Sequence, residues 1–253
     1  MGSGGDLHRT AGGGGQDLEA RLLEGAARLG VAVTQGQARQ LLAYQELLLA
    51  AAGRLNLTAV HDAAEALEKH ILDSISLFRV LDGRDEADVI DVGSGGGLPG
   101  IPVKIMRPRW HVCLLDSSAK KVQVMAGMCA ALQLQGIQAL HGRAEELARR
   151  ESFRDSMDVA VARAVAPMAV LLELCLPFVR PGGVMVAMKG PAVEEELPAA
   201  RRALSLLAGE VAARDSFRLP FSGARRELVV IRKIGPTDQK YPRRPGVPSR
   251  RPL

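Results

Sequence analysis

The stretch from Asp88 to Pro102 has the sequence DVIDVGSGGGLPGIP, in which glycine is the most frequent residue. The apolar residues Val89, Ile90 and Val92 predict a buried strand, and five glycines follow it within eight residues. Glycine lets a ligand approach the main chain without meeting a Cβ atom, and a helix beginning near Ile101 would direct its free N–H groups at that ligand. The stretch is therefore typical of a site for a nucleotide-like cofactor. A glycine-rich turn that binds nothing is the alternative.

Two cofactor patterns fit these glycines. The dinucleotide pattern G-x-G-x-x-G matches Gly95, Gly97 and Gly100. The pattern D-x-G-x-G-x-G, the first motif of S-adenosylmethionine-dependent methyltransferases, matches Asp91, Gly93, Gly95 and Gly97. A carboxylate at the end of the strand suits a cofactor with a cationic ammonium group and would repel the pyrophosphate of a dinucleotide. The sequence therefore favours S-adenosylmethionine.

Polar residues follow three later predicted strands, at the edge where ligands bind in parallel sheets. Asp116 could accept both hydroxyls of an adenosine ribose, or it could cap the helix that begins at Ser118. Ala144 and Glu145 could bracket an adenine edge with a backbone N–H and a side chain. Arg163 stands between apolar residues and needs an acceptor, which could be the cofactor, RNA or a structural carboxylate.

The elements that must position these residues divide the chain into four parts. Residues 1–16 form a flexible, glycine-rich leader, and order is expected to begin near Asp17. Residues 17–83 form a helical section, in which the pairs Thr34 with Gln37 and Asp62 with Glu65 predict two helix starts. Residues 84–235 form the cofactor-binding domain, and residues 236–253 form a basic, proline-rich arm.

Within 84–235, strands alternate with helices, which predicts a doubly wound, Rossmann-like α/β sheet. After the strand in the glycine-rich stretch, four more are expected at 111–116, 137–142, 157–164 and 183–190. Helices are expected at 118–136, from 144 toward 150, and around Leu171. The segments 211–219 and 227–234 predict an antiparallel hairpin at the end of this domain.

Composition restricts the class of protein. The 253 residues are 47% hydrophobic, enough for a substantial core, and no uncharged apolar run approaches the ~18 residues of a membrane span. The three cysteines form no C-x-x-C pair, which favours reduced, buried thiols and a cytoplasmic location. The histidines show no HExxH spacing either, so we expect no metal. We also expect a monomer.

Positive charge is concentrated near the end of the chain. The formal net charge is +5, and residues 236–253 contain a single acidic residue against five basic ones: Lys240, Arg243, Arg244, Arg250 and Arg251. Because the arm also holds five prolines, we expect it to be extended, without a helix, and suited to phosphate contacts. One alternative is that this basic segment only increases the solubility of the protein. The other is an arm that folds back along the sheet and supports the cofactor site.

Several stretches together resemble one family. They are NLTAV (56–60), KHILDS (69–74), DVGSGGGLPGIP (91–102), LLDS (114–117), GRAEE (142–146), ARAVAP (162–167), MKG (188–190), ELVVI (227–231) and KYPRRPGVPSRRPL (240–253). In combination they resemble the RsmG family, also called GidB, over about residues 40–253. The resemblance implies a class I methyltransferase fold and an enzyme that uses S-adenosylmethionine to methylate N7 of a guanine in bacterial 16S rRNA, alone or in the small ribosomal subunit.

The resemblance also implies site residues. It implies the cofactor contacts Gly93, Leu98, Asp116, Ser117, Ser118, Ala144, Glu145 and Arg163, to which the glycine motif adds Asp91, Gly95 and Gly97. The expected RNA contacts are Arg143, Lys189 and Arg226, to which the charge of the arm adds its five basic residues. Glu227 stands where the family has histidine, and AAAGRL (50–55) replaces a segment that usually contains tryptophan.

Little side-chain chemistry is expected at such a site. Guanine N7 already carries a lone pair, so transfer needs alignment more than a general base, and we expect Arg163 and Lys189 to position the base. No proton-transferring residue can be named. The alternatives are a methyltransferase for a protein or small molecule, a nicotinamide-dependent oxidoreductase, and a non-catalytic RNA-binding protein.

Overall fold

The computed structural model describes residues 13–55, 57–81, 83–163 and 165–253. Most of the expected leader, residues 1–12, lies outside this part, as does Asn56 of the NLTAV stretch. The first helix, α1 (Gly13–Arg28), begins earlier than the expected start of order near Asp17.

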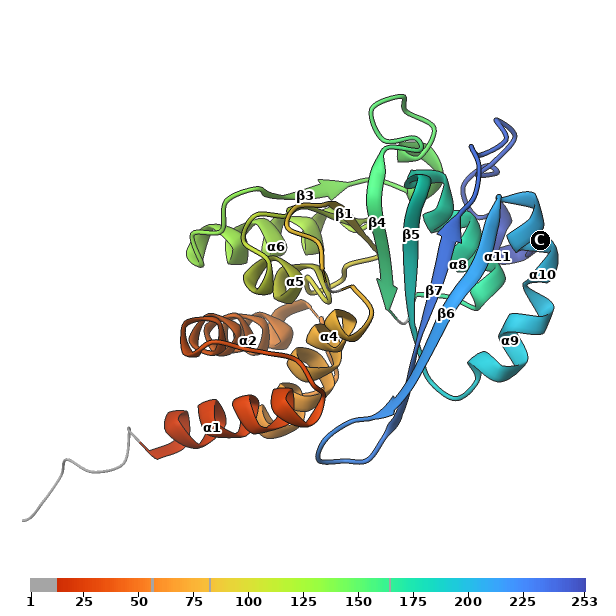
Figure 1. Ribbon diagram of the computed structural model, residues 1–253. Coiled ribbons are helices and arrows are strands. Elements are labelled where there is room, and N and C mark those ends of the chain that lie inside the picture. Colours follow the sequence, from red (N-terminus) through yellow and green to blue (C-terminus); the bar gives the residue numbers. More distant parts are fainter. Residues whose placement is uncertain (1–12, 56, 82, 164) are drawn as a thin grey trace, which may run out of the picture.

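The described part of the chain contains a seven-stranded sheet with the order β3-β2-β1-β4-β5-β7-β6 (Figure 1). The first five strands in this order are parallel, and β7 pairs antiparallel with both β5 and β6. The strands are β1 (Asp88–Val92), β2 (His111–Asp116), β3 (Ile137–His141), β4 (Met157–Arg163), β5 (Val179–Lys189), β6 (Gly209–Arg218) and β7 (Arg225–Lys233). The predicted α/β sheet and its C-terminal hairpin are confirmed.

The order of the strands indicates where the candidate site lies. The chain passes from β1 to β2 and β3 on one side and returns to β4 on the other side of β1. At such a reversal the connections leave the sheet in opposite directions, so a crevice opens at the carboxyl ends of the two strands. Asp91 lies between Leu114 of β2 and Val161 of β4, directly below this crevice.

Two apolar layers cover the sheet, because successive side chains of a buried strand point to opposite faces. On β1, Val89 belongs to one cluster and Ile90 to the other. The first cluster includes side chains from α1, α2 (Gln35–Leu55), α5 (Gly100–Met106) and α6 (Ala119–Ala131). The second includes side chains from α7 (Ala144–Leu147), α8 (Met168–Cys175), η3 (Leu176–Phe178), α9 (Val193–Ala199) and α10 (Arg201–Leu206). Helices α9 and α10 were not expected from the sequence.

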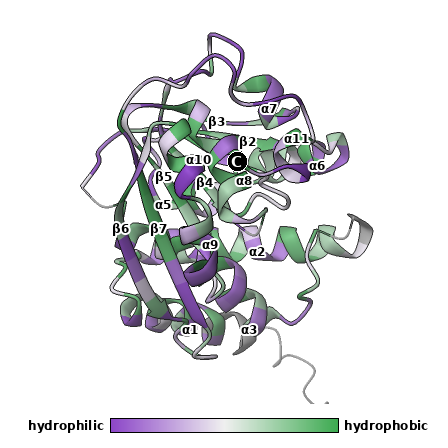
Figure 2. Cartoon of the chain, turned by 90° about the vertical axis from the view of Figure 1, so that its right-hand side faces the viewer, coloured by the Kyte–Doolittle hydropathy of each residue, from purple (hydrophilic) through white to green (hydrophobic). Residues whose placement is uncertain are grey.

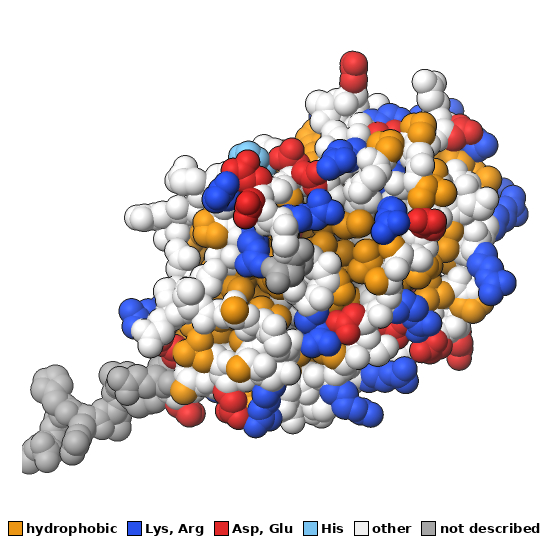
Figure 3. Space-filling view, viewed as in Figure 1, with side chains coloured by type: hydrophobic (Ala, Val, Ile, Leu, Met, Phe, Trp, Pro, Cys, Tyr) orange, Lys and Arg blue, Asp and Glu red, His pale blue; other side chains and the backbone are white. Residues whose placement is uncertain are grey.

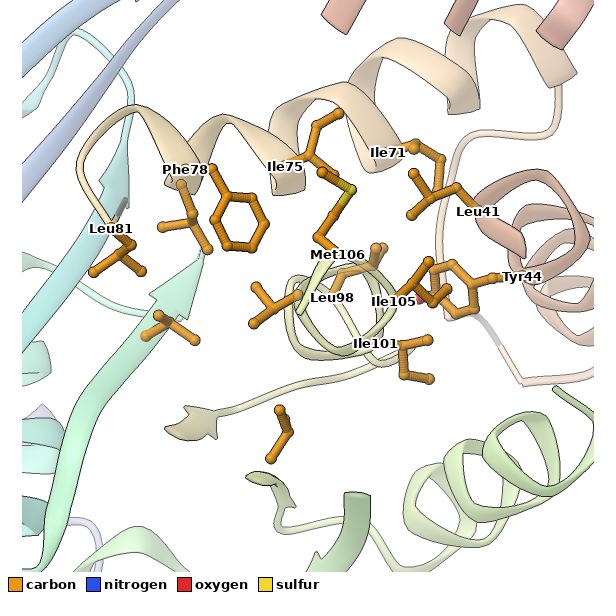
Figure 4. Close-up of a cluster of buried hydrophobic side chains, with 14 of the residues drawn as sticks. Leu41, Tyr44, Ile71, Ile75, Phe78, Leu81, Leu98, Ile101, Ile105 and Met106 are labelled. Carbon is orange, nitrogen blue, oxygen red and sulfur yellow. The ribbon is translucent and has the colours of Figure 1, made fainter. Parts of the chain in front are cut away.

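The N-terminal helices pack directly against α5 (Figure 4). Leu41 and Tyr44 of α2 lie on one side of α5, and Ile75 and Phe78 of the next helical run lie on another. That run is irregular and consists of α3 (Ala63–Ala66), the π-helical η1 (Leu67–Leu72), α4 (Asp73–Ile75) and the 3₁₀-helical η2 (Ser76–Arg79). The helical section therefore shares its core with the sheet.

Both predicted helix starts are confirmed. The Thr34 hydroxyl accepts the Gln37 N–H at 3.2 Å, and the Gln37 side chain accepts the Thr34 N–H at 2.9 Å. The Asp62 carboxylate accepts the Glu65 N–H at 2.8 Å. The first of these two helices, α2, extends to Leu55.

The β6–β7 hairpin connects the sheet to the N-terminal helical section. Its turn reaches the N-terminal helices (Figure 1), where Glu68 accepts the N–H groups of Phe221 at 2.7 Å and Ser222 at 2.8 Å. The Arg21 guanidinium lies 4.0 Å from the centre of the Phe221 ring. Most of β6 is exposed, and hydrophilic stretches run along β6 and β7 (Figure 2). Charged side chains also suit β6 as an edge strand, because they oppose pairing with another chain.

Candidate active site

The glycine loop follows β1 and crosses the crevice. Gly93 has φ +80°, a left-handed conformation that residues with a Cβ rarely adopt. A Cβ at Gly100 would lie 2.2 Å from the Leu114 side chain and 2.8 Å from Asp91 Oδ2, so only glycine lets α5 begin this close to the strands. These two glycines are therefore required by the backbone geometry of the loop.

Asp91 lies beneath the loop and is fully buried. Its Oδ2 accepts the Gly100 N–H at 2.8 Å, while its Oδ1 is a buried atom without a hydrogen-bond partner among the described residues. Burial raises the pKa of this carboxyl to about 7. A buried, unpartnered carboxylate oxygen beside the glycine loop fits a cationic group, as expected for the ammonium end of S-adenosylmethionine.

Asp116 links the loop to the start of α6. Its Oδ2 accepts the Gly95 N–H at 2.9 Å, and its Oδ1 accepts the Ser118 N–H at 2.8 Å. The expected contact with the helix start is therefore present. Each carboxylate oxygen keeps a further lone pair, so the ribose contact stays a prediction.

A cavity of about 190 Å³ opens beside Asp116. Its walls include six of the residues expected at the site: Gly93, Asp116, Ser117, Arg143, Ala144 and Glu145. The other expected cofactor residues lie elsewhere. Asp91, Gly95, Gly97 and Ser118 are outside the walls of this cavity, and the Leu98 side chain packs in the apolar cluster around α5 (Figure 4).

A second cavity, of about 420 Å³, lies at the carboxyl ends of β4 and β5. Its walls carry four basic side chains and two acidic ones, namely Lys69, Arg163, Lys189, Arg226, Asp73 and Glu196. Arg163 was expected beside the cofactor, but it lines this second cavity. The positive excess suits a polyanion such as RNA.

A buried carboxylate organises this second cavity. Asp73 Oδ2 lies 3.2 Å from Arg163 Nη1, and Asp73 Oδ1 accepts Arg226 Nε at 3.0 Å. The acceptor that Arg163 needs is therefore a structural carboxylate, together with the Lys69 carbonyl at 2.9 Å. Lys189 pairs with Glu196 at 2.6 Å and also donates to the Ala166 carbonyl.

His70 also lines the second cavity. Its Nε2 lies 2.7 Å from the Thr58 hydroxyl, and burial lowers its pKa to about 4. The imidazole is therefore neutral at physiological pH. Asp73, His70 and Glu196 were not expected at the site, although the KHILDS stretch contains two of them.

The prediction of an extended arm at 236–253 is wrong. The segment folds back onto the α7–α8 side of the sheet, Tyr241 is buried, and Val247–Arg250 forms the short helix α11. Proline does not prevent α11, because Pro248 stands in its first turn, where the missing N–H has no intrahelical partner. The alternative of an arm that folds back is correct.

The basic residues of this segment differ in their surroundings. Arg243 is paired with buried Glu173 at 2.6 Å, and Lys240 lies 3.0 Å from Asp238. Arg244, Arg250 and Arg251 are exposed. Glu227, which stands where histidine was expected, is buried and paired with Arg214 and Ser216.

Neither a metal centre nor a membrane span is found within the described ranges. They hold no group of three or more His, Cys, Asp or Glu placed to bind a metal ion, and no helix long and apolar enough to cross a membrane. Cys113, Cys129 and Cys175 are buried and free, as predicted, and burial raises the pKa of each thiol.

Comparison with known proteins decides the family. A family model described as GidB, rRNA small subunit methyltransferase G, matches residues 37–229. The chain belongs to the GidB family. Its relatives include the ribosomal RNA small subunit methyltransferase G of Alkaliphilus oremlandii (strain OhILAs), 41% identical over 237 residues, which are 94% of this chain and 99% of that protein. The protein of the same name from Moorella thermoacetica is 46% identical over 226 residues, 88% of this chain and 93% of the relative.

The solved structures are similar to this chain in fold alone. YcgJ from Bacillus subtilis is 12% identical with a TM-score of 0.51, covering 66% of this chain and 100% of that one. TrmN from Thermus thermophilus is 19% identical with a TM-score of 0.50, covering 66% of this chain and 53% of that one. As a GidB member, the protein is an S-adenosylmethionine-dependent methyltransferase. The oxidoreductase and non-catalytic alternatives are therefore wrong.

Proposed function

We propose that this protein transfers the methyl group of S-adenosylmethionine to N7 of a guanine in 16S rRNA, as a monomer in the cytoplasm. The observation that carries the proposal is the pair of cavities at the carboxyl edge of the sheet. Val165 and Ala166 line the cavity beside Asp116, and Arg163, two residues earlier, lines the charged cavity. A cofactor in the first cavity and a base in the second would therefore be bound by residues close together in the chain.

The reaction needs alignment. When bound, S-adenosylmethionine supplies a methyl group on a sulfonium centre, and the lone pair of guanine N7 forms the new C–N bond as the C–S bond breaks. No proton is transferred, so the absence of an assigned general base does not conflict with the proposal. The product guanine is cationic, and the carboxylates of Asp73 and Glu196 offset part of the repulsion from the four basic side chains of the charged cavity.

Basic residues would hold the RNA. Arg163, Lys189 and Arg226 enter the charged cavity from three different strands or strand ends, and each is already oriented by a carboxylate. Arg143 lines the cofactor cavity and is exposed. On the face shown in Figure 3, Lys and Arg side chains are spread among acidic ones rather than gathered in one patch. This distribution supports contacts with phosphates at several points of a folded RNA.

The test is methyl transfer with radiolabelled S-adenosylmethionine. Small ribosomal subunits that lack the modification, the same subunits already methylated, and naked 16S rRNA are the three substrates. We expect near-stoichiometric label in the rRNA of the unmodified subunits and none in the methylated subunits. Naked 16S rRNA shows whether the ribosomal proteins of the subunit are needed. Label in ribosomal proteins, or none in any substrate, would overturn the proposed function.

A further inference from the structure

The C-terminal segment, residues 236–253, reaches the cofactor cavity. Gly246 and Ser249 stand in its wall, together with Asp116 and Ser117. At about 190 Å³ the cavity is smaller than the ~300 Å³ typical at the lower end for ligand pockets. A ligand of nucleoside size in this cavity therefore touches all its walls, including the C-terminal one.

A buried ion pair anchors the segment before it enters the cavity wall. Glu173 of α8 is fully buried, and a carboxylate in such a place is costly unless it is paired and hydrogen-bonded. Arg243 supplies both the ion pair and a hydrogen bond. Its Nη2 lies 2.6 Å from Glu173 Oε2, and its backbone N–H donates to Glu173 Oε1 at 2.8 Å. This pair fixes the position of the chain three residues before Gly246.

Two further arginines hold the backbone of the segment. Arg149 donates to the carbonyls of Gln239, Lys240 and Pro242, and Arg154 donates to those of Thr237, Asp238 and Tyr241. These bonds go to the main chain and do not depend on the identity of the side chains. The segment from 237 to 243 is therefore fixed in place.

One hydrogen bond connects Glu145 of α7 to the C-terminal wall of the cavity. Glu145 is 7% exposed, and its Oε1 accepts the Gly246 N–H at 2.9 Å. A hydrogen bond from an N–H to a carboxylate is stronger than one between neutral groups. Gly246 has φ +79°, so its backbone conformation is one that glycine adopts at little cost. Because Glu145 and Gly246 both line the cavity, this bond joins its α7 wall to its C-terminal wall.

We propose that residues 246–249 form a wall of the cofactor site over the adenosine, and that Glu145 is a positioning residue that acts on the cofactor through Gly246. This inference rests on the use of S-adenosylmethionine by the proposed function, and it gives residues to the alternative in which the segment supports the cofactor site.

The test compares three substitutions in the full chain. Glu145→Ala removes the acceptor, Glu145→Gln keeps an amide oxygen there, and Glu146→Ala makes the same change at an exposed position of the same helical turn. Binding of S-adenosylhomocysteine and of 5′-methylthioadenosine is measured by calorimetry without RNA. For Glu145→Ala we expect about a tenfold loss for both ligands, the scale of one hydrogen bond to a charged group. The other two variants should stay within about twofold of the wild type.

A double-mutant cycle separates positioning from direct contact. Gly246→Ala disfavours the φ of +79° at which the N–H donor is held, and so displaces that donor from the other side of the same bond. If Glu145 acts through Gly246, adding Glu145→Ala to Gly246→Ala should cause no further loss of affinity, and KM for S-adenosylmethionine should rise with little change in kcat. Two results overturn the inference: unchanged affinity in folded Glu145→Ala, or a full additional loss in the double variant.

The wild-type protein provides the check on the proposed function. S-adenosylhomocysteine binding without methylation of rRNA would overturn the substrate assignment and leave the positioning role intact. If the wild type binds neither ligand, the cofactor site itself is wrong, and this inference fails with it.

Discussion

The hydroxyl of Tyr44 donates a hydrogen bond of 2.9 Å to the carbonyl oxygen of Gly96. Tyr44 is fully buried on α2, and Gly96 is part of the cofactor loop. Leu48, one turn further along α2, is so close that a Cβ at Gly96 would lie 2.6 Å from its side chain. The N-terminal helical section is thus the support behind the glycine loop.

Tyr44→Phe should weaken cofactor binding several-fold while the protein stays folded. The substitution keeps the ring and leaves a buried carbonyl without its donor, which costs about 1–3 kcal/mol. Calorimetric affinity and urea unfolding of the same variant measure both effects. Tyr241→Phe is the matched control, because it removes a hydroxyl that does not contact the loop. Equal cofactor affinities for the two variants would show that the loop does not depend on Tyr44.

Gly93→Ala should abolish most cofactor binding. The new Cβ would lie 2.8 Å from a Val165 methyl group, and φ of +80° costs a residue other than glycine about 1–2 kcal/mol. Gly127→Ala on α6 is the control, since nothing lies within 4 Å of that position and alanine favours the helix. Normal affinity in a folded Gly93→Ala protein would exclude this loop as the cofactor site.

Asp91 should make cofactor affinity depend on pH. Burial raises its pKa from 3.8 to about 7, so between these values the folded protein binds a proton that the unfolded chain does not. Stability without cofactor should therefore fall as the pH rises from about 4 to about 7. The cationic end of the cofactor favours the ionised carboxylate, so its affinity should rise as the pH passes from about 6 to 7.5.

The variant Asp91→Asn tests this assignment. It keeps an oxygen for the Gly100 N–H, and its cofactor affinity should be weaker and flat over the same pH range. The pH range stays below the ~8 at which the cofactor's own amino group titrates. If the rise in affinity persisted in Asp91→Asn, another group would be responsible.

The exposed basic residues of the C-terminal segment should contact phosphate. Replacing Arg244, Arg250 and Arg251 with alanine should weaken RNA binding and flatten its salt dependence by about 0.7–0.9 in log–log slope for each lost contact. Cofactor affinity should not change. The control triple, Arg84, Arg109 and Arg180, removes the same charge near the amino ends of the strands. An unchanged slope in the first variant would refute phosphate contact by this segment.

Local patterns in the sequence predicted much of the fold. The apolar runs of β1 and β4 are buried on both faces and have few alternatives to a parallel sheet, and the side chains of Thr34 and Asp62 cap helices within three residues of themselves. The glycine loop was equally clear, because Gly93 and Gly100 are required by backbone geometry that only glycine allows.

Contacts between distant residues could not be predicted in the same way. The pairing of Asp73 with Arg163, and of Glu173 with Arg243, joins residues 90 and 70 positions apart, and nothing local in the sequence marks either partner. For the same reason the basic composition of the last segment suggested an extended arm. The buried carboxylate of Glu173 on α8 pairs with Arg243 and holds it against the protein, and the composition of the segment gives no sign of this contact.

The most direct test of the proposed methylation is the position of the new methyl group on the RNA. A guanine methylated at N7 carries a positive ring charge, and borohydride reduction followed by aniline cuts the RNA chain at that nucleotide. After incubation of unmodified small subunits with the protein and S-adenosylmethionine, we predict a single new cut in 16S rRNA, absent with Gly93→Ala. Methyl label in the rRNA without such a cut would contradict attack by guanine N7.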